Sequence, residues 1–154
     1  MKLLRVGQHG LEKVAVIDSE NKIRDLSSHI DDLNPETINF KTLEKLKKIK
    51  IDTLPEVSKS IRIGSCVNRP SNILCIGLNY SLHAEQTGSK LPDNPIVFNK
   101  SPDCLQGPND PIKKNRSQEK LDYEVELALV IGKEAKNIDE EKALDYVFGY
   151  FILN

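Results

Sequence analysis

The sequence LDYEVELALVI at residues 121–131 decides the fold of this 154-residue chain. Its side chains alternate in character with a period of two, which is typical of a β-strand. Val125 and Leu127 point to one face, and Glu124 and Glu126 point to the other. Because a strand rises by about 3.3 Å per residue, the two carboxylates lie roughly 7 Å apart. We therefore predict a strand over residues 121–131 that carries two like charges on one face.

The neighbours of Glu124 and Glu126 are nearly all apolar, so we expect this strand to be largely buried. Two buried carboxylates cost several kcal/mol each if nothing compensates their charge. Mg²⁺ or Mn²⁺ would compensate it well, since both ions favour oxygen ligands and accept water or substrate in the remaining positions. An exposed edge strand, or a pair neutralised by Lys or Arg, would fit the same pattern.

Short apolar runs separated by turn residues predict the other strands and helices of the chain. Strands are predicted over residues 2–6, 13–17, 23–26, 60–65, 72–78, 96–99 and from 150 onward. Helical segments are predicted over residues 42–49 and 139–146, the last ended by Gly149, and residues 81–86 are predicted to form a turn or one helical stretch. The fold class is α+β, with a small N-terminal β-rich domain over residues 1–68 and a second domain over residues 69–154.

His83 follows the predicted strand 72–78 in the segment GLNYSLHAEQTG. A histidine just beyond the end of a buried strand is well placed for general acid–base catalysis, because its pKa lies near neutrality. A structural or surface histidine that forms hydrogen bonds is the alternative.

Composition narrows the classes of function. A net charge of -1, with 38% hydrophobic and 29% charged residues, is typical of a globular protein and gives no general attraction to nucleic acid or anionic lipid. No apolar run approaches the roughly 20 residues that span a bilayer, and the N-terminus lacks the apolar core of a secretion signal. The three cysteines form no disulfide or zinc spacing. We expect a cytoplasmic protein without nucleic-acid or membrane partners.

Two motifs together resemble the fumarylacetoacetate hydrolase superfamily. They are NILCIGLNYSLHAEQTG at residues 72–88 and LDYEVELALVIGKEAKNIDEEKALDYVFGY at residues 121–150. The segment between them, with PIVF at 95–98 and GPNDP at 107–111, is similar as well. The N-terminal part resembles the small leading domain of the bacterial-type members. Some of these act on 2,4-diketo-3-deoxy sugar acids such as 2,4-diketo-3-deoxy-L-fuconate, and others are described as ureidoglycolate lyases.

The resemblance implies a mixed β-roll, often dimeric, that binds Mg²⁺ or Mn²⁺. Glu124 and Glu126 match the first two metal ligands of the family. The third is an Asp in a G-Y-x-x-x-N-D stretch, which residues 149–154 match as far as Asn154. The chain stops where that Asp would follow, so we expect an N-terminal piece whose roll is incomplete and exposes strand edges and apolar surface.

In the family, an H-x-x-E pair orients and activates a water molecule. His83 matches the histidine of this pair, but Gln86 stands three residues later and Glu85 only two. Glutamine forms hydrogen bonds but accepts no proton at neutral pH. Either Glu85 substitutes after a local shift, or the pair is weakened.

The function implied is that of a metal-dependent hydrolase, homodimeric when complete, that cleaves a carbon–carbon bond in a small 2,4-diketo acid. That substrate would be an acylpyruvate or a diketo-deoxy sugar acid. One alternative is an activity of the ureidoglycolate lyase type. The other is a non-catalytic truncated chain that only binds or assembles with a partner.

Overall fold

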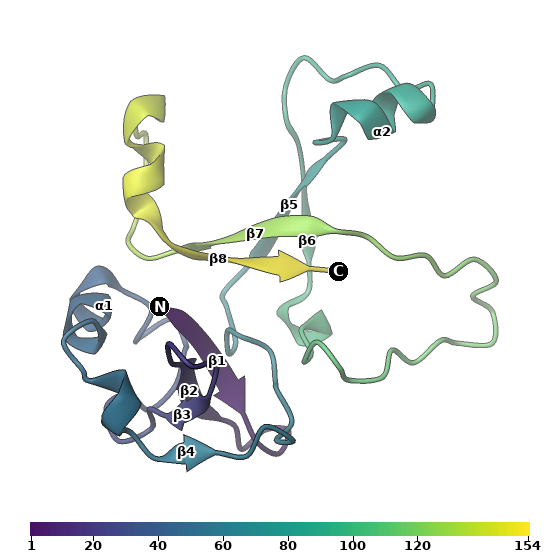
Figure 1. Ribbon diagram of the computed structural model, residues 1–154. Coiled ribbons are helices and arrows are strands. Elements are labelled where there is room, and N and C mark those ends of the chain that lie inside the picture. Colours follow the sequence, from purple (N-terminus) through teal and green to yellow (C-terminus); the bar gives the residue numbers. More distant parts are fainter. The chain divides into compact units, whose positions relative to one another are not determined.

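The computed structural model describes residues 1–154 (Figure 1). The chain divides into two compact units, residues 69–105 and a unit made of residues 1–68 with 106–154. The predicted domains, 1–68 and 69–154, stay a prediction. No helix in the structure has the length and apolar character needed to cross a membrane.

The first unit contains a four-stranded antiparallel sheet built by the N-terminal residues. Its strands, in the order β1-β2-β3-β4, are Lys2–Val6, Lys13–Ile17, Ile23–Asp25 and Glu56–Val57. The three strands predicted before residue 30 are confirmed. The strand predicted over residues 60–65 is wrong, because that segment forms only one isolated bridge, between Ile63 and Val6.

Turn chemistry sets the register of this sheet. Between β2 and β3, one Asp18 carboxylate oxygen accepts hydrogen bonds from the backbone N–H groups of Glu20 and Lys22, at 2.9 and 2.8 Å. This Asx-type arrangement closes the turn, in which Asn21 adopts a φ of 61°. The other carboxylate oxygen accepts from Arg24 Nε at 2.7 Å, so the turn is also fixed to β3.

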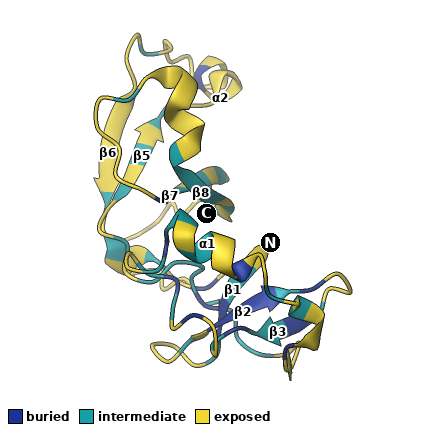
Figure 2. Cartoon of the chain, turned by 90° about the vertical axis from the view of Figure 1, so that its left-hand side faces the viewer, coloured by how far each residue is buried: buried dark blue, intermediate teal, exposed yellow.

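The hydrophobic core lies against β2, in which Val14, Ala15 and Val16 are all fully buried (Figure 2). Val14 and Val16 belong to a cluster with Leu26, Ile30, Leu33, Ile38, Leu46 and Leu54. Ala15 belongs to a second cluster, with Val6 and Ile23. The central strand is therefore covered on both faces, which is the arrangement that a continuous apolar strand needs.

The helix α1, Phe40–Leu46, contributes Leu46 to that core. It begins after Asn39, whose side-chain oxygen accepts a hydrogen bond from the Thr42 N–H at 2.9 Å and so caps the helix. The predicted helix is confirmed, although it begins and ends earlier than residues 42–49. A short 3₁₀ helix, Ile51–Thr53, follows it.

The C-terminal part of this unit is an antiparallel ribbon of two strands, β7 (Glu126–Ile131) and β8 (Val147–Leu153), with a 3₁₀ helix at Glu140–Tyr146 between them. The predicted strand over residues 121–131 is wrong in its first half, because pairing begins only at Glu126. Gly149 lies inside β8, so its predicted role in ending the preceding helix is wrong as well.

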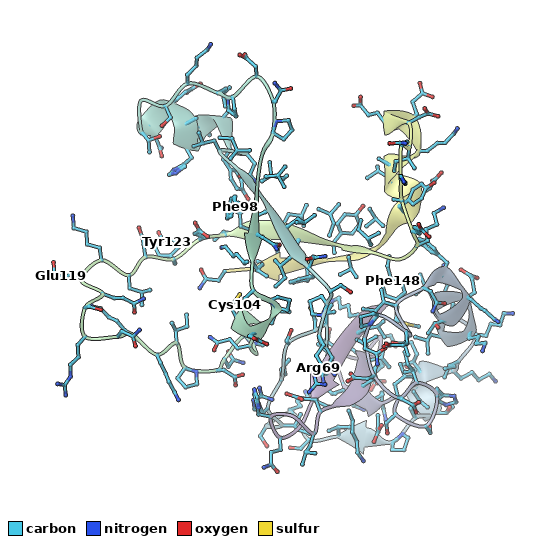
Figure 3. All side chains as sticks on the ribbon, turned by 180° about the vertical axis from the view of Figure 1, so that it is seen from behind. Arg69, Phe98, Cys104, Glu119, Tyr123 and Phe148 are labelled. Atoms are coloured by element: carbon cyan, nitrogen blue, oxygen red, sulfur yellow. The ribbon has the colours of Figure 1, made fainter.

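One end of the ribbon packs on the N-terminal core. Val130 and Phe148 contact the cluster around Val14. Figure 3 labels Phe148 at this end of the ribbon. The ammonium group of Lys133 lies 4.1 Å from the ring centre of Tyr146 and 5.6 Å from that of Phe40 in α1. These contacts fix the β7–β8 ribbon to the N-terminal residues by apolar and cation–π interactions.

The second unit contains the antiparallel pair β5 (Ile73–Gly77) and β6 (Ile96–Lys100), with α2 (Ser81–Gln86) between them and a 3₁₀ helix at Pro102–Cys104 after them. All three segments predicted here are confirmed, and residues 81–86 form a short α-helix. Most side chains of β6 are exposed.

Candidate functional site

The carboxylate pair lies where the β7–β8 ribbon begins. Glu126 is the first residue of β7 and pairs with Leu153 in β8. Glu124 precedes the strand, and its backbone N–H donates a hydrogen bond to the side-chain oxygen of Asn154 at 2.8 Å. The Asn154 side chain thereby continues the pairing of the two segments past the last residue of β8.

The predicted burial of the two carboxylates is wrong for the chain as it stands. Glu124 is exposed and Glu126 is half-buried. The apolar neighbours on the opposite face, Val125, Leu127 and Leu129, on which the expectation of a buried strand rests, are themselves about half exposed or more. The strand therefore does not remove the two carboxylates from water in the way that its apolar sequence predicts.

If they served as metal donors, the two glutamates would supply only part of a coordination shell. Nowhere in residues 1–154 do three or more His, Cys, Asp or Glu side chains form a group that could hold a metal ion. Mg²⁺ typically takes one or two carboxylates and completes its shell with water and substrate oxygens. The chemistry of Glu124 and Glu126 thus fits Mg²⁺ or Mn²⁺, with the remaining ligands coming from elsewhere.

His83 lies in α2 with its side chain exposed. Its carbonyl accepts hydrogen bonds from the N–H and the hydroxyl of Thr87, at 3.1 and 2.9 Å, which closes the C-terminal end of the helix. The helix is reached from β5 through Leu78, whose φ of 51° is uncommon for a bulky residue. Backbone strain of this kind clusters at functional sites, which makes the β5–α2 junction a candidate site.

The helical conformation decides which neighbour His83 can use. Residues three apart lie side by side on a helix, whereas residues two apart point in different directions. Since α2 is helical through Gln86, Gln86 shares a side of the helix with His83, and Glu85 does not. Glu85 is exposed at the other side. The geometry thus favours Gln86 over Glu85 as the residue that supports His83.

The structure brings the predicted site residues together in two separate sets. Glu124 and Glu126 lie in the unit of residues 1–68 with 106–154, and His83, Glu85 and Gln86 lie in the unit of residues 69–105. The roles of all five residues remain predictions.

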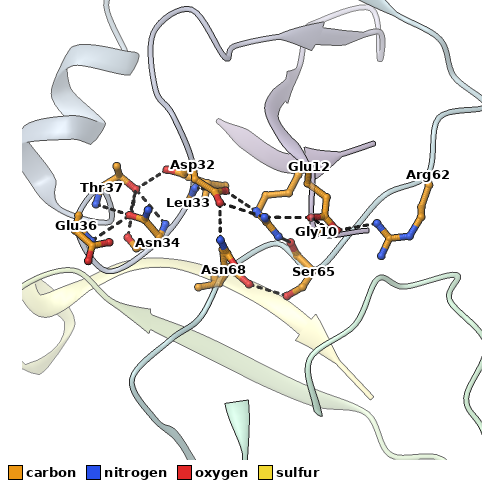
Figure 4. Close-up of polar contacts among 12 residues, drawn as sticks. Gly10, Glu12, Asp32, Leu33, Asn34, Glu36, Thr37, Arg62, Ser65 and Asn68 are labelled. Carbon is orange, nitrogen blue, oxygen red and sulfur yellow. Dashed lines mark hydrogen bonds and ion pairs between the residues drawn. The ribbon is translucent and has the colours of Figure 1, made fainter. Parts of the chain in front are cut away.

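A buried ionic network in the N-terminal residues was not predicted (Figure 4). Arg5 in β1 is buried and pairs with Asp32 and with Glu12. Arg62 donates a hydrogen bond to Glu12 at 2.8 Å. It also donates to both carboxylate oxygens of Asp110, at 2.8 and 2.6 Å. The network thereby joins the GPNDP segment at residues 107–111 to the N-terminal sheet.

Charge within this network lowers the pKa values of its acids. The Arg62 guanidinium holds the pKa of the Asp110 carboxyl below its usual range. Burial raises the pKa of Glu12, but hydrogen bonding to Arg62 and to backbone N–H groups outweighs it, so that pKa is lowered overall. Gly107 completes the contact, because a side chain there would meet the Ile63 carbonyl oxygen at 2.2 Å. The one signal available in the sequence is that Arg5 falls among the apolar residues of β1.

Comparison with known sequences identifies the family. Residues 72–154 match the sequence model described as the C-terminal region of fumarylacetoacetate (FAA) hydrolase. The chain belongs to the fumarylacetoacetate hydrolase family. The match covers the β5–α2 segment with His83 and the β7–β8 ribbon with Glu124 and Glu126, which the sequence motifs had singled out.

Relatives and a solved structure agree with this assignment. The chain is 46% identical over all 154 residues to a Burkholderia ambifaria protein and 45% identical to one from Burkholderia multivorans, both named only "putative hydrolase". It is similar to the fumarylacetoacetate hydrolase of Exiguobacterium antarcticum, with 29% identity and a TM-score of 0.75 over 99% of this chain and 54% of that one. The chain spans about half the length of the curated relatives it matches, 55% in both Burkholderia proteins.

Proposed function

We propose that Glu124 and Glu126 supply two ligands of a Mg²⁺ or Mn²⁺ site in a hydrolase that cleaves a carbon–carbon bond in a 2,4-diketo acid. The observation that carries the proposal is the position of the pair at the start of β7, opposite the C-terminal end of β8. A small oxo-acid substrate, a homodimeric whole protein and a cytoplasmic location belong to the same proposal and rest on the family resemblance.

The register of the ribbon supports a third carboxylate at this place. Glu126 lies opposite Leu153, so each step back along the first strand corresponds to one step forward along the second. A residue that followed Asn154 would therefore lie opposite Glu124. In the family motif that residue is an aspartate, and directly opposite residues have Cβ atoms about 5 Å apart. The three acids would then form one cluster of oxygen donors.

In this proposal, His83 and Gln86 provide proton transfer and orientation. When bound, a divalent cation stabilises the negative charge that develops on the substrate oxygens. His83 would take a proton from the water that attacks the C4 carbonyl, and Gln86 would orient His83 or that water by a hydrogen bond. The carbon–carbon bond then breaks, and the leaving carbon receives a proton. Gln86 cannot share the proton itself, so His83 is the only base in this pair.

A second candidate function is a non-catalytic one, in which the chain contributes half of a site and has no activity alone. The half-length match to the relatives and the lack of any three-acid cluster favour it. Both candidates assign the same role to the glutamate pair, so a binding measurement must precede an activity measurement.

The test is calorimetric titration of the 154-residue protein with MgCl₂ and MnCl₂. We expect one site per chain, lost in Glu126→Gln and retained in the matched control Glu119→Gln, which changes an exposed glutamate in the same segment. Assays with acylpyruvates, diketo sugar acids and ureidoglycolate then separate a hydrolase from a lyase and from an inactive chain. Binding that Glu126→Gln leaves unchanged would contradict the proposal.

A further inference from the structure

The β7–β8 ribbon has two faces that differ in burial. Cross-strand pairs place Glu126, Ala128, Val130, Phe151 and Leu153 on one face, and every one of them is half-buried. The other face consists of large apolar side chains with high exposed fractions: Leu127 57%, Leu129 49%, Tyr150 57% and Ile152 73%. This second set of four residues is called the outer face below.

The outer face is unusual for a surface that meets water. Its four residues lie in two adjacent cross-strand pairs, Leu127 with Ile152 and Leu129 with Tyr150, so they form one continuous apolar patch. Contiguous exposed apolar surface on this scale marks a site that another surface covers. The sheet has only two strands, so β8 also has an edge along which no further strand of this sheet pairs. A ribbon of this kind is at best marginally stable in water without a further strand or a packed layer.

The lengths of the relatives indicate what covers it. The Burkholderia ambifaria protein aligns with all of this chain but only 55% of its own length, and the Exiguobacterium antarcticum structure matches 99% of this chain with 54% of its own. About half of the family fold therefore has no counterpart within these 154 residues. The outer face carries no charged side chain, so it suits an apolar sheet or helix rather than a nucleic acid or an acidic peptide.

We infer that the outer face is the docking surface for a polypeptide corresponding to the other half of the family fold. The partner packs apolar side chains on Leu127, Leu129, Tyr150 and Ile152 and extends the sheet along the outer edge of β8. A separately produced half is therefore sufficient to bind this chain, without a peptide link between the two. The inference concerns assembly and does not depend on the proposed metal chemistry.

The experiment is co-expression of the tagged 154-residue chain with the remaining residues of the Burkholderia ambifaria relative, followed by affinity purification and analytical ultracentrifugation. A 1:1 complex is expected, and Leu129→Lys and Ile152→Lys are each expected to weaken it at least tenfold. Leu144→Lys is the matched control, because Leu144 is 70% exposed but lies in the 3₁₀ helix outside the outer face. All three positions are exposed, so circular dichroism should show the same fold in each variant.

Three results would overturn the inference. The first is that no complex is recovered. The second is a complex that Leu129→Lys and Ile152→Lys weaken no more than Leu144→Lys does. The third is a stable dimer of the 154-residue chain alone that Leu129→Lys dissociates and that the added half does not displace, since the outer face would then belong to a second copy. None of these readouts involves a metal ion or turnover, so they are independent of the calorimetric test.

Discussion

Two strands of similar sequence differ in what surrounds them. β2 reads KVAVI and has three consecutive fully buried residues, whereas β7 reads ELALVI and alternates between half-buried and exposed residues. β2 lies between β1 and β3 and beneath the core that α1 completes. β7 pairs only with β8. An apolar strand sequence thus favours burial, but the strand is buried only where other segments of the protein pack on it.

The largest expected effect contrasts one leucine from each region. Leu26 is fully buried in the core against β2, and Leu129 is half exposed in β7. Leu26→Ala should lower the free energy of unfolding by about 2–5 kcal/mol, through lost burial and a cavity. Leu129→Ala should change it by less than about 0.5 kcal/mol. Urea denaturation followed by circular dichroism checks both, and equal losses would break the comparison.

Removal of the buried Arg5 guanidinium in β1 should lower the free energy of unfolding somewhat less than Leu26→Ala does. Arg5→Met leaves Asp32 and Glu12 without this cation in a largely buried site, while Asn68 and Arg62 still donate to them, and should lower the free energy of unfolding by about 2–3 kcal/mol. Arg116→Met, which changes an exposed arginine, is the control and should be near neutral. The same urea titrations measure it. A neutral Arg5→Met would show that the network contributes nothing to the stability of the N-terminal sheet.

Two glycines offer a smaller contrast. A methyl group at Gly107 would overlap the Ile63 carbonyl oxygen, whereas one at Gly149 in β8 would meet nothing within 4 Å. Gly107→Ala should therefore lower the thermal midpoint by several degrees, corresponding to about 1–3 kcal/mol. Gly149→Ala should leave the midpoint unchanged or slightly raised. The opposite order in differential scanning calorimetry would mean that the GPNDP segment is not held against the N-terminal sheet.

The smallest of these effects is the loss of unfolding free energy at acid pH that comes from protonation of Asp32. Burial raises the pKa of Asp32, but hydrogen bonds from Arg5, the Leu33 N–H and Asn68 lower it further, so the net pKa falls below its usual range. A depressed carboxyl pKa stabilises the fold above the unfolded value near pH 4, and that contribution is lost as pH falls through the folded value. Unfolding at pH 7 and pH 3 should show a smaller difference in Asp32→Asn, by about 1 kcal/mol or less. An unchanged pH dependence in this variant would contradict the assignment.

The sequence predicts the strands that pair with segments nearby in the chain. It does not predict where a strand begins or ends when its partner is distant in the sequence. The alternation of residues 121–125 is as regular as that of 126–131, but β8 ends at Leu153, so the ladder ends at Glu126. Gly149 was read as a helix terminator because glycine commonly ends helices. In the structure it lies opposite Val130, beside the register shift in the ribbon, where glycine is also typical.

The candidate site shows the same limit. The two glutamates and His83 could be found from motifs, because motifs are local. The exposure of Glu124 could not, because it depends on where the ladder between β7 and β8 begins, and that start is set by residues far along the chain. Arg5 was missed because its partners, Glu12 and Asp32, lie 7 and 27 residues away. Only the helical backbone of α2 showed that Gln86, and not Glu85, lies beside His83.

Hydrogen exchange measured by mass spectrometry tests most directly whether the ribbon depends on a missing partner. In the 154-residue chain alone, peptides from β2 should exchange at the rate of global unfolding, while peptides from β7 and β8 should exchange much faster. Addition of the other half of the family fold should slow exchange in β7 and β8 and leave β2 unchanged. If β7 and β8 are as well protected as β2 in the chain alone, the ribbon needs no partner and the account is contradicted.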